Sequence, residues 1–340
     1  MKRFMPRISL LCAIIVLSSI HLAYGAGYNF ITVDYPGAVS TNLNGINNSG
    51  QTVGSFGSST WPYTYGFIRD SSGNFTNTLT YQNAFVTDPR GINNNDTIVG
   101  TYMVNIETPP QYGGYPQGFQ YQGGVYNQIT YPGAPSTWAH GINDSGTIVG
   151  ANDIDPTNYR HAFVKNGVNF QSLDILGAFQ SGANGINNSG QIVGFIDNST
   201  NTLVAYHGFF RDSGGNATQL DFPSASATWA MAINNMGQIV GSYYDTVTYS
   251  QGGGWSLSGE HGFLLNNSVY LSIDFPGAVD SQLNGINDDG WLVGTYWDGT
   301  QSHGYIAQPL SDTVPEPSTF LLLGAGLGGL ALLRRKSRKQ

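Results

Sequence analysis

The sequence predicts an all-β protein, a six-bladed β-propeller of four-stranded antiparallel blades, and three observations favour this fold class. A phrase that reads GINNSGQIVGF in its fourth copy occurs six times, at spacings of 44 to 53 residues that are typical of propeller blades or solenoid coils. Between copies there is room for two more short strands. The chain before the first copy also carries an extra strand that the last copy lacks. The copies begin at Gly45, Gly91, Gly141, Gly185, Ala232 and Gly285.

Each copy of the phrase predicts a tight β-hairpin. An Ile-Asn pair before the turn and a Val-Gly pair after it are the same in all six copies. In the first copy Asn47 opens the turn, where its side chain can bond to the backbone, and Gly50 can take the left-handed conformation that closes it. Asp96 stands at the glycine position of the second copy, and Asp tolerates that conformation better than most residues do. Gly54 lies within the second strand, which predicts a close approach of another backbone.

Two further phrases complete the unit. A Gly-aromatic pair such as Gly208-Phe209 predicts the third strand, and a segment that ends in Asp-aromatic-Pro, such as residues 274–276, predicts the fourth. The sixth unit reaches Pro309 without a fourth strand, while residues 29–35 form a lone strand before the first hairpin. We therefore expect the N-terminal strand to close the last blade, which removes the exposed edges of an open array.

Residues 1–25 predict a secretory signal peptide. Three basic residues precede an apolar run over residues 8–20, and small residues for cleavage follow at Ala23 and Gly25. An uncleaved membrane anchor is the alternative, but the apolar run is short for a membrane span. Cys12 lies in this peptide, so the exported chain has no cysteine and its stability cannot depend on disulfides.

Residues 27–312 form the predicted propeller domain, and its charge excludes one class of partner. The domain holds 5 Lys and Arg against 20 Asp and Glu, a net charge of −15. A surface with this much negative charge repels phosphate backbones. We therefore expect no nucleic-acid partner. We also expect no metal and no cofactor. Four histidines share one repeat position but head different third strands, too far apart to hold one ion, so structural hydrogen bonds are expected for His161, His207, His261 and His303.

No catalytic set stands out in this domain. The arginines are scattered among the units, and no nucleophile-elbow motif is present. A glycosidase needs two opposed carboxylates, and the spacing singles out no such pair. We therefore predict a non-enzymatic binding or structural module. The alternative is a polysaccharide hydrolase or lyase that uses carboxylates in the central channel, and a purely structural coat component is a third possibility.

Aromatic loops predict where a ligand would bind. The loops between second and third strands and those that lead into the next blade lie on one face of the ring, and they vary most in length. Flat rings beside Asn and Asp suit sugars, although large loops can also pack on themselves. Trp138 and Trp229 occupy matching positions, alongside His140 and Arg90. The predicted ligand-binding residues are Trp138, Trp229, Trp61, Tyr63, Tyr115, Tyr159, Tyr244, Trp255 and Trp297.

The C-terminal segment, residues 313–340, contains Pro315, Glu316 and Pro317, then an apolar run over residues 320–333 and a basic cluster. It closely resembles the PEP-CTERM sorting signal. The resemblance implies export in a Gram-negative bacterium, anchoring in the inner membrane by a short transmembrane helix, and processing by an exosortase near the Pro-Glu-Pro. Such proteins are associated with bacteria that form biofilms and produce exopolysaccharide.

The repeated body resembles the HAF family of extracellular repeats, whose triad stands here as His161-Ala162-Phe163. The resemblance covers nearly all of the body, with Gly at the middle position in most copies and the His missing in two. It implies no established activity. We therefore expect an exported, surface- or matrix-associated module whose partners are the export machinery, an exosortase and exopolysaccharide.

Overall fold

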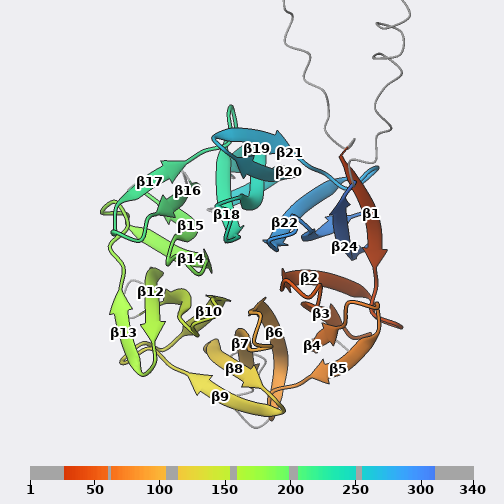
Figure 1. Ribbon diagram of the computed structural model, residues 1–340, viewed down its shortest axis with the longest axis horizontal. Helices are drawn as coiled ribbons and strands as arrows, with labels where there is room; N and C mark the ends of the chain where they lie inside the picture. The colour runs from red at the N-terminus through yellow and green to blue at the C-terminus, as the bar shows by residue number, and fades with distance from the viewer. Residues whose placement is uncertain are drawn as a thin grey trace, which may run out of the picture.

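The computed structural model describes residues 27–59, 63–104, 114–153, 159–198, 206–249 and 255–310. Within these ranges the chain forms 24 strands and no helix, which confirms the predicted all-β class. The strands form sheets that stand around a central axis (Figure 1). The predicted signal peptide, the sorting motif and the C-terminal transmembrane helix lie outside the described residues. Over the described part of the chain, no helix is long and apolar enough to cross a membrane.

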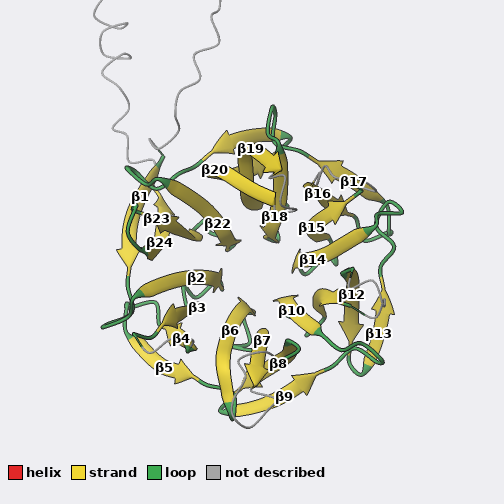
Figure 2. Cartoon of the chain, turned by 180° about the vertical axis from the view of Figure 1, so that it is seen from behind, coloured by secondary structure: helices red, strands yellow, loops and turns green. Residues whose placement is uncertain are grey.

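Each repeat unit contributes strands in order from the axis outward, an arrangement visible from both sides of the ring (Figures 1 and 2). The innermost strands are β2 (Ser40–Ile46), β6 (Ala84–Ile92), β10 (Thr137–Ile142), β14 (Gln180–Ile186), β18 (Ala227–Ile233) and β22 (Asp280–Ile286). The second strands are β3 (Thr52–Gly57), β7 (Ile98–Val104), β11 (Ile148–Asn152), β15 (Ile192–Asp197), β19 (Ile239–Tyr249) and β23 (Leu292–Trp297). The third strands are β4 (Thr64–Arg69), β8 (Gln117–Gln122), β12 (His161–Asn166), β16 (Tyr206–Arg211), β20 (Trp255–Asn266) and β24 (Ser302–Pro309). The outermost strands are β5 (Phe75–Leu79), β9 (Val125–Ile129), β13 (Asn169–Ser172), β17 (Ala217–Leu220), β21 (Val269–Ser272) and β1 (Tyr28–Val33).

The strands form four sheets of four strands and one sheet of eight. The eight-stranded sheet holds two repeat units, which a single parallel pair between Thr64 and Val86 joins. Within each unit the pairing is antiparallel. The sheet of the last unit has the order β1-β24-β23-β22, so the N-terminal strand pairs with the last strand of the chain, from Tyr28 with Pro309 to Val33 with Gly304.

The predicted hairpins are present. In the first, the Gly50 N–H donates to the Asn47 carbonyl over 3.1 Å, and the Asn47 side-chain Oδ1 accepts from the Gln51 N–H over 3.0 Å. Gly50 has a φ of 78° and Asp96, at the same position of the second hairpin, a φ of 57°. Turn chemistry that is local in the sequence therefore sets the register of each inner pair of strands.

Glycine in the second strand lets an aromatic ring pack against the sheet. A Cβ at Gly54 would collide with the backbone carbonyl oxygen of Asn42, which confirms the predicted close approach of another backbone, and would lie 2.8 Å from the ring of Phe67. A Cβ at Gly194 would likewise collide with the Gly182 carbonyl oxygen and lie 2.8 Å from the ring of Phe209. The third strand of every unit supplies such a ring, and all are fully buried: Phe67, Phe119, Phe163, Phe209, Phe263 and Tyr305. The Val-Gly and Gly-aromatic phrases are thus two halves of one packing contact.

Hydrophobic clusters lie between neighbouring units. One of them joins Leu43 and Phe67 of the first unit to Val293 and Ile306 of the last. Buried asparagines add polar links, since the Nδ2 of the first Asn of each hairpin donates to the backbone carbonyl of its counterpart in the next unit. These bonds run from Asn47 to Asn93, Asn143, Asn187, Asn234 and Asn287, and the last returns to Asn47.

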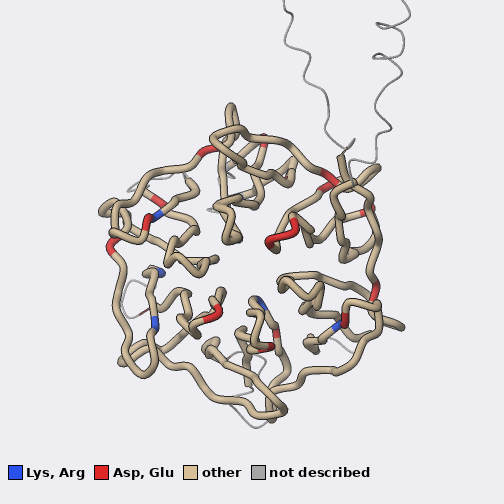
Figure 3. Tube along the Cα trace, viewed as in Figure 1, with Lys and Arg blue, Asp and Glu red and all other residues tan. Residues whose placement is uncertain are grey.

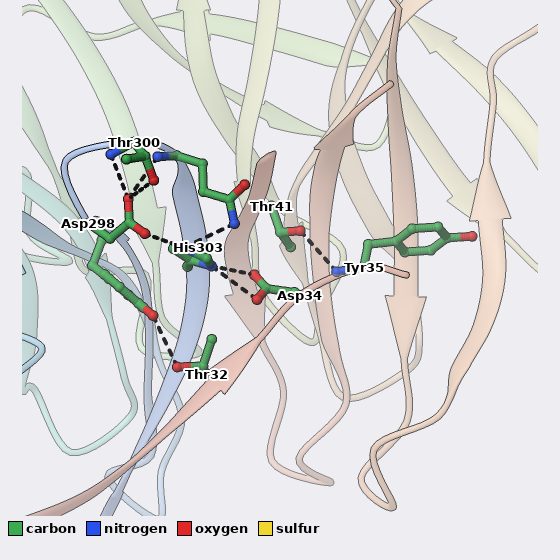
Figure 4. Close-up of polar contacts among 9 residues, drawn as sticks. Thr32, Asp34, Tyr35, Thr41, Asp298, Thr300 and His303 are labelled. Atoms are coloured by element: carbon green, nitrogen blue, oxygen red, sulfur yellow. Dashed lines mark hydrogen bonds and ion pairs between the residues drawn. The ribbon is translucent and has the colours of Figure 1, made fainter. Parts of the chain in front are cut away.

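Histidines at the head of the third strand bind aspartates at the end of the outermost strand. His207 Nδ1 lies 2.8 Å from Asp221, His261 Nδ1 lies 2.8 Å from Asp274, and His303 Nδ1 lies 2.9 Å from Asp34. The predicted structural hydrogen bond is thus confirmed for these three histidines. Figure 4 shows His303 between Asp34 and Asp298, whose carboxylate lies 3.3 Å from the Nε2 of the same ring.

Candidate functional site

The candidate site begins with a β-bulge that occurs in all six innermost strands. In each strand the pairing register shifts at the residue before the Gly or Ala that opens the repeated phrase. A bulged residue leaves the regular alternation of side chains, so a bulge can turn a side chain in a new direction. Here the six bulged side chains border the central cavity: Asn44, Arg90, His140, Asn184, Met231 and Asn284.

Hydrogen bonds to the next unit hold most of these bulged side chains in place. Asn44 Nδ2 donates to the Pro89 carbonyl over 2.7 Å, and Asn284 Nδ2 donates to the Leu43 carbonyl over 2.9 Å. Asn184 and His140 make the corresponding bonds to the carbonyls of Ala230 and Ala183, over 2.9 and 3.1 Å. The bulged residues therefore form an ordered floor under the cavity.

The residue after each bulge, a glycine in all units but the fifth, where it is Ala232, explains why the channel narrows below this floor. A Cβ at Gly91 would lie 2.8 Å from the His140 carbonyl oxygen, and one at Gly141 would lie 2.7 Å from the Asn184 carbonyl oxygen. Backbones of neighbouring inner strands thus approach closely around the axis. The space at this level has a volume of about 90 Å³, against about 560 Å³ for the cavity above it.

Loop and strand residues of three neighbouring units form the wall of the cavity: Trp138, Arg160, Gln180, Phe195, Tyr206 and Trp229. Tyr206 contacts Trp229 edge-on, with ring centroids 5.2 Å apart, and contacts Phe195 at 5.9 Å. Partial burial raises the pKa of Tyr206, so its phenol is neutral and can donate a hydrogen bond at neutral pH. These edge-to-face contacts fix the aromatic wall.

Three basic side chains border the same cavity. Arg90 Nε lies 2.6 Å from an oxygen of Asp88, and the guanidinium carbon of Arg160 lies 4.4 Å from the centre of the Trp138 ring. Desolvation, together with the nearby charges of Arg90 and Arg160, lowers the pKa of His140 to about 3. His140 is therefore neutral at neutral pH. Its Nδ1 carries the proton, because it faces the Ala183 carbonyl oxygen.

The opposite end of the channel has different chemistry. The second residue of each hairpin turn donates its N–H to a side-chain oxygen of its counterpart, around a cycle of Asn48, Asn94, Asp144, Asn188, Asn235 and Asp288. The two carboxylates also accept amide bonds: Asp144 from Asn94 and Asn188, and Asp288 from Asn48 and Asn235. Although burial alone would raise it, the pKa of Asp144 is lowered by the bonds from Asn188 and Asn94.

The structure distributes the predicted ligand-binding residues between the cavity and the outer loops. Trp138 and Trp229 border the cavity, and the buried Tyr244 supports Trp229 from behind, at 5.4 Å, while its hydroxyl donates to Glu260 over 2.6 Å. Tyr159 packs edge-on against Phe179. The remaining described residues are not part of the cavity lining: Tyr63, which stacks beside Tyr65, and the exposed Tyr115 and Trp297. Trp61 and the side chain of Trp255 lie outside the described residues.

Sequence reasoning missed several lining residues, among them Arg160, Tyr206, Gln180 and the asparagines of the floor. The floor left a signal in the sequence, since each of its residues directly precedes the repeated phrase, a position that holds Asn, Arg, His or Met. The wall left no signal, because its residues come from different units and from unlike positions within them.

Similar structures are distant in sequence. The β-propeller domain of the Trilobed protease from Pyrococcus furiosus has a TM-score of 0.45 at 12% identity, with 79% of this chain and 84% of that chain covered. The sialidase of Trypanosoma rangeli has a TM-score of 0.47 at 9% identity over 79% of this chain and 55% of that chain. A polysaccharide lyase of family PL25, an ulvan lyase, has a TM-score of 0.39 at 12% identity, with 80% of this chain and 86% of that chain covered. Similarity at this level says nothing about activity. No curated protein matches the sequence.

One segment of the chain matches a known family. The model of the PEP-CTERM protein-sorting motif matches residues 313–336, the segment in which Pro315, Glu316 and Pro317 precede the apolar run and the basic cluster. This confirms the resemblance of the tail, whereas the HAF-type repeat of the body stays a prediction. The chain carries a PEP-CTERM protein-sorting motif, which implies that it is exported and processed by an exosortase.

Proposed function

We propose that the protein is a binding module for exopolysaccharide at the cell surface or in the extracellular matrix, built on a closed six-bladed propeller. Pairing of β1 with β24 supports closure, as does the hydrogen bond from Asn287 back to Asn47. Six innermost strands, each followed by one copy of the repeated hairpin, support the blade number, with the eight-stranded sheet taken as two blades. The sorting motif supports export, and the destination beyond the inner membrane is part of the proposal.

The observation that carries the proposal is the central cavity. Its volume of about 560 Å³ is within the usual range for small-ligand sites, and it combines the aromatic faces of Trp138 and Trp229 with amide groups of the floor. Sugar rings present apolar faces and many hydroxyl groups, so they suit aromatic rings next to hydrogen-bonding amides. The floor is held by bonds to neighbouring blades, so the site is formed before a ligand arrives.

The hydrolase or lyase that would use channel carboxylates has less support. Among the described residues that border the cavity there is no Asp or Glu. The two carboxylates near the axis, Asp144 and Asp288, lie at the far end of the channel, where each accepts hydrogen bonds from two asparagine amides. Carboxylates held in this way as acceptors are poorly placed to act as a general acid.

The test is retention of the purified protein on the exopolysaccharide of the bacterium that produces it. We expect Trp138→Ala and Trp229→Ala each to weaken retention about five- to thirtyfold, since stacking on an aromatic ring contributes on the order of 1–2 kcal/mol to such contacts. Trp297→Ala is the matched control, because this tryptophan is exposed at the end of β23 and does not border the cavity. It should leave retention unchanged.

Three other outcomes would contradict this proposal. Equal retention by all variants would remove the cavity as the binding site. Release of reducing ends or of unsaturated sugars would favour the enzyme. Self-association without any retention would instead point to a structural coat component.

A further inference from the structure

We propose that the cavity recognises an acidic sugar, a uronic acid at a chain end or side branch of the polysaccharide, and that Arg160 binds its carboxylate. This inference rests on the proposed function and names the class of ligand for the same cavity. It follows from the distribution of charge, from the surroundings of two arginines, and from the shape of the floor.

The charge of the cavity is opposite to that of the domain around it. Of the five Lys and Arg residues between positions 27 and 312, two border the cavity, Arg90 and Arg160, whereas none of its described lining residues is acidic. Acidic positions are spread around the rest of the ring (Figure 3). An anionic ligand would therefore be repelled by most of the described surface and attracted at this one place.

The two arginines differ in what balances their charge. Arg90 forms an ion pair with Asp88 at 2.6 Å, and the other oxygen of Asp88 accepts from Asn44 Nδ2 at 2.9 Å. Arg160 forms no ion pair with any described residue, and its guanidinium faces the Trp138 ring at 4.4 Å. Desolvation and, less strongly, the charge of Arg90 lower the pKa of Arg160, whereas Tyr206 and the charge of Asp153 raise it, and an arginine stays charged at neutral pH. Of the two cavity arginines, Arg160 is therefore the one that has no ion-pair partner among the described residues, so its donors can bind a ligand.

Arginine on an aromatic ring suits a carboxylate in particular. The guanidinium is a planar fork that binds a carboxylate through two parallel hydrogen bonds, and stacking on an indole restricts its motion without using its donors. A uronic acid carries such a carboxylate on a sugar ring, which could contact the aromatic wall formed by Tyr206 and Trp229 at the same time. His140 is neutral and so adds no second cation to the site.

The shape of the floor limits how a polymer could enter. Below the bulged residues the channel is narrower, and the space there has a volume of about 90 Å³. The cause is the close approach of the backbones around Gly91 and Gly141 to those of the neighbouring units. A polysaccharide chain therefore cannot thread through the ring from the cavity. A terminal unit or a single-residue branch can enter it.

Binding of defined oligosaccharides to the purified chain in detergent tests this proposal. The probes are a trisaccharide that ends in glucuronic acid, the same trisaccharide ending in glucose, and one whose terminal glucose carries a 6-sulfate. Tryptophan fluorescence and calorimetry supply the dissociation constants. We expect the glucuronate probe to bind at least about tenfold more tightly than the glucose probe, because one hydrogen bond to a charged group contributes about this much to affinity.

Two variants identify the residue responsible. Arg160→Gln should remove the preference, so that the glucuronate probe binds no more tightly than the glucose probe. Arg211→Gln is the matched control, because Arg211 ends a third strand and does not border the cavity. It should preserve the preference for the acidic probe. Circular dichroism of both variants verifies that the fold is intact.

The outcomes separate this inference from the proposed function. Equal affinity for the glucuronate and glucose probes would overturn the acidic-sugar proposal and leave a binding module for neutral sugar. Equal affinity for the glucuronate and sulfate probes would overturn the specificity for a carboxylate. Failure of all three probes and of the polysaccharide to bind would overturn both proposals.

Discussion

At the scale of single residues, the invariant asparagine of each hairpin explains why the repeated phrase tolerates so little change. Asn187 is 3% exposed, and its Oδ1 accepts the N–H groups of Ser189 and Gln191 over 3.1 and 3.0 Å. Its Nδ2 donates to the side chain of Gln191 over 2.7 Å and to the carbonyl of Asn234, in the next unit, over 3.1 Å. All four hydrogen-bonding positions of the amide are used, and no other side chain supplies the same set.

We predict that Asn187→Ala lowers the free energy of unfolding by about 2–4 kcal/mol, because it leaves a buried N–H and a buried carbonyl without partners. Asn188→Ala is the control. That residue is exposed, and its side chain accepts from the exposed N–H of Asp144 and donates to the exposed Asp144 carboxylate, so its replacement should cost less than about 1 kcal/mol. Urea unfolding followed by tryptophan fluorescence measures both changes. An equal loss in the two variants would show that the buried bond to Asn234 contributes little.

At the scale of elements, the pair between His303 and Asp34 fastens the N-terminal strand β1 to β24. His303 is 9% exposed and lies between two carboxylates, with Gln301 beside its Nε2 and the ring of Tyr296 stacked at 4.9 Å. Desolvation lowers the pKa of His303, but the bonds to Asp34 and Asp298 outweigh it, so the pKa is raised above its ordinary value. The arrangement resembles that of His261 between Asp274 and Asp245, whose pKa is also raised.

This geometry predicts a dependence of stability on pH. A histidine with a raised pKa in the folded state stabilises the fold fully below its unfolded pKa of about 6.5, and this contribution is lost as the pH rises through the folded pKa. We therefore expect the free energy of unfolding to be highest below about pH 6.5 and to fall as the pH rises above this value. His303→Gln should reduce this fall but not abolish it, since His261 titrates in the same direction. Urea unfolding at a series of pH values below and above this point is the measurement. An identical fall of the free energy of unfolding in the variant would contradict the role of His303.

At the scale of the whole molecule, the pairing of β1 with β24 joins the first and last strands of the described residues. Six residue pairs link β1 to β24, and Val33 packs with Leu43, Val293 and Ile306. Without β1, the outer edge of β24 would present unpaired N–H and carbonyl groups, which favour association with other chains. The pairing of β1 with β24, which lie far apart in the sequence, thus contributes both to stability and to solubility.

We predict that deletion of residues 27–39, with the predicted signal peptide joined to Ser40, lowers the unfolding temperature by about 10 °C. A loss of about 3–5 kcal/mol from the missing strand, at about 2–4 °C per kcal/mol, leads to this value. A synthetic peptide of residues 27–39 should restore most of the loss, whereas a scrambled peptide should not. Scanning calorimetry and analytical ultracentrifugation measure the two effects. Unchanged stability of the truncated chain would show that β1 is dispensable.

The sequence alone determined the repeat units, the hairpins and the partner of the lone N-terminal strand. These features depend on local chemistry, such as Asn47 and Gly50 in a turn, or on an unfilled place in a repeat, and both are visible without knowledge of distant contacts. The position of Trp138 and Trp229 at the cavity could also be predicted in part, because they stand at matching positions of two repeats.

Only the tertiary structure decided which side chains meet at the axis. A β-bulge shifts the alternation of a strand by one residue, so the direction of Asn44 or His140 could not be taken from the period of two. Arg160 and Tyr206 come from different units and meet only because the ring brings those units together. The chemistry of the cavity is therefore a property of how the repeats are arranged in space, whereas the repeats themselves follow from local sequence.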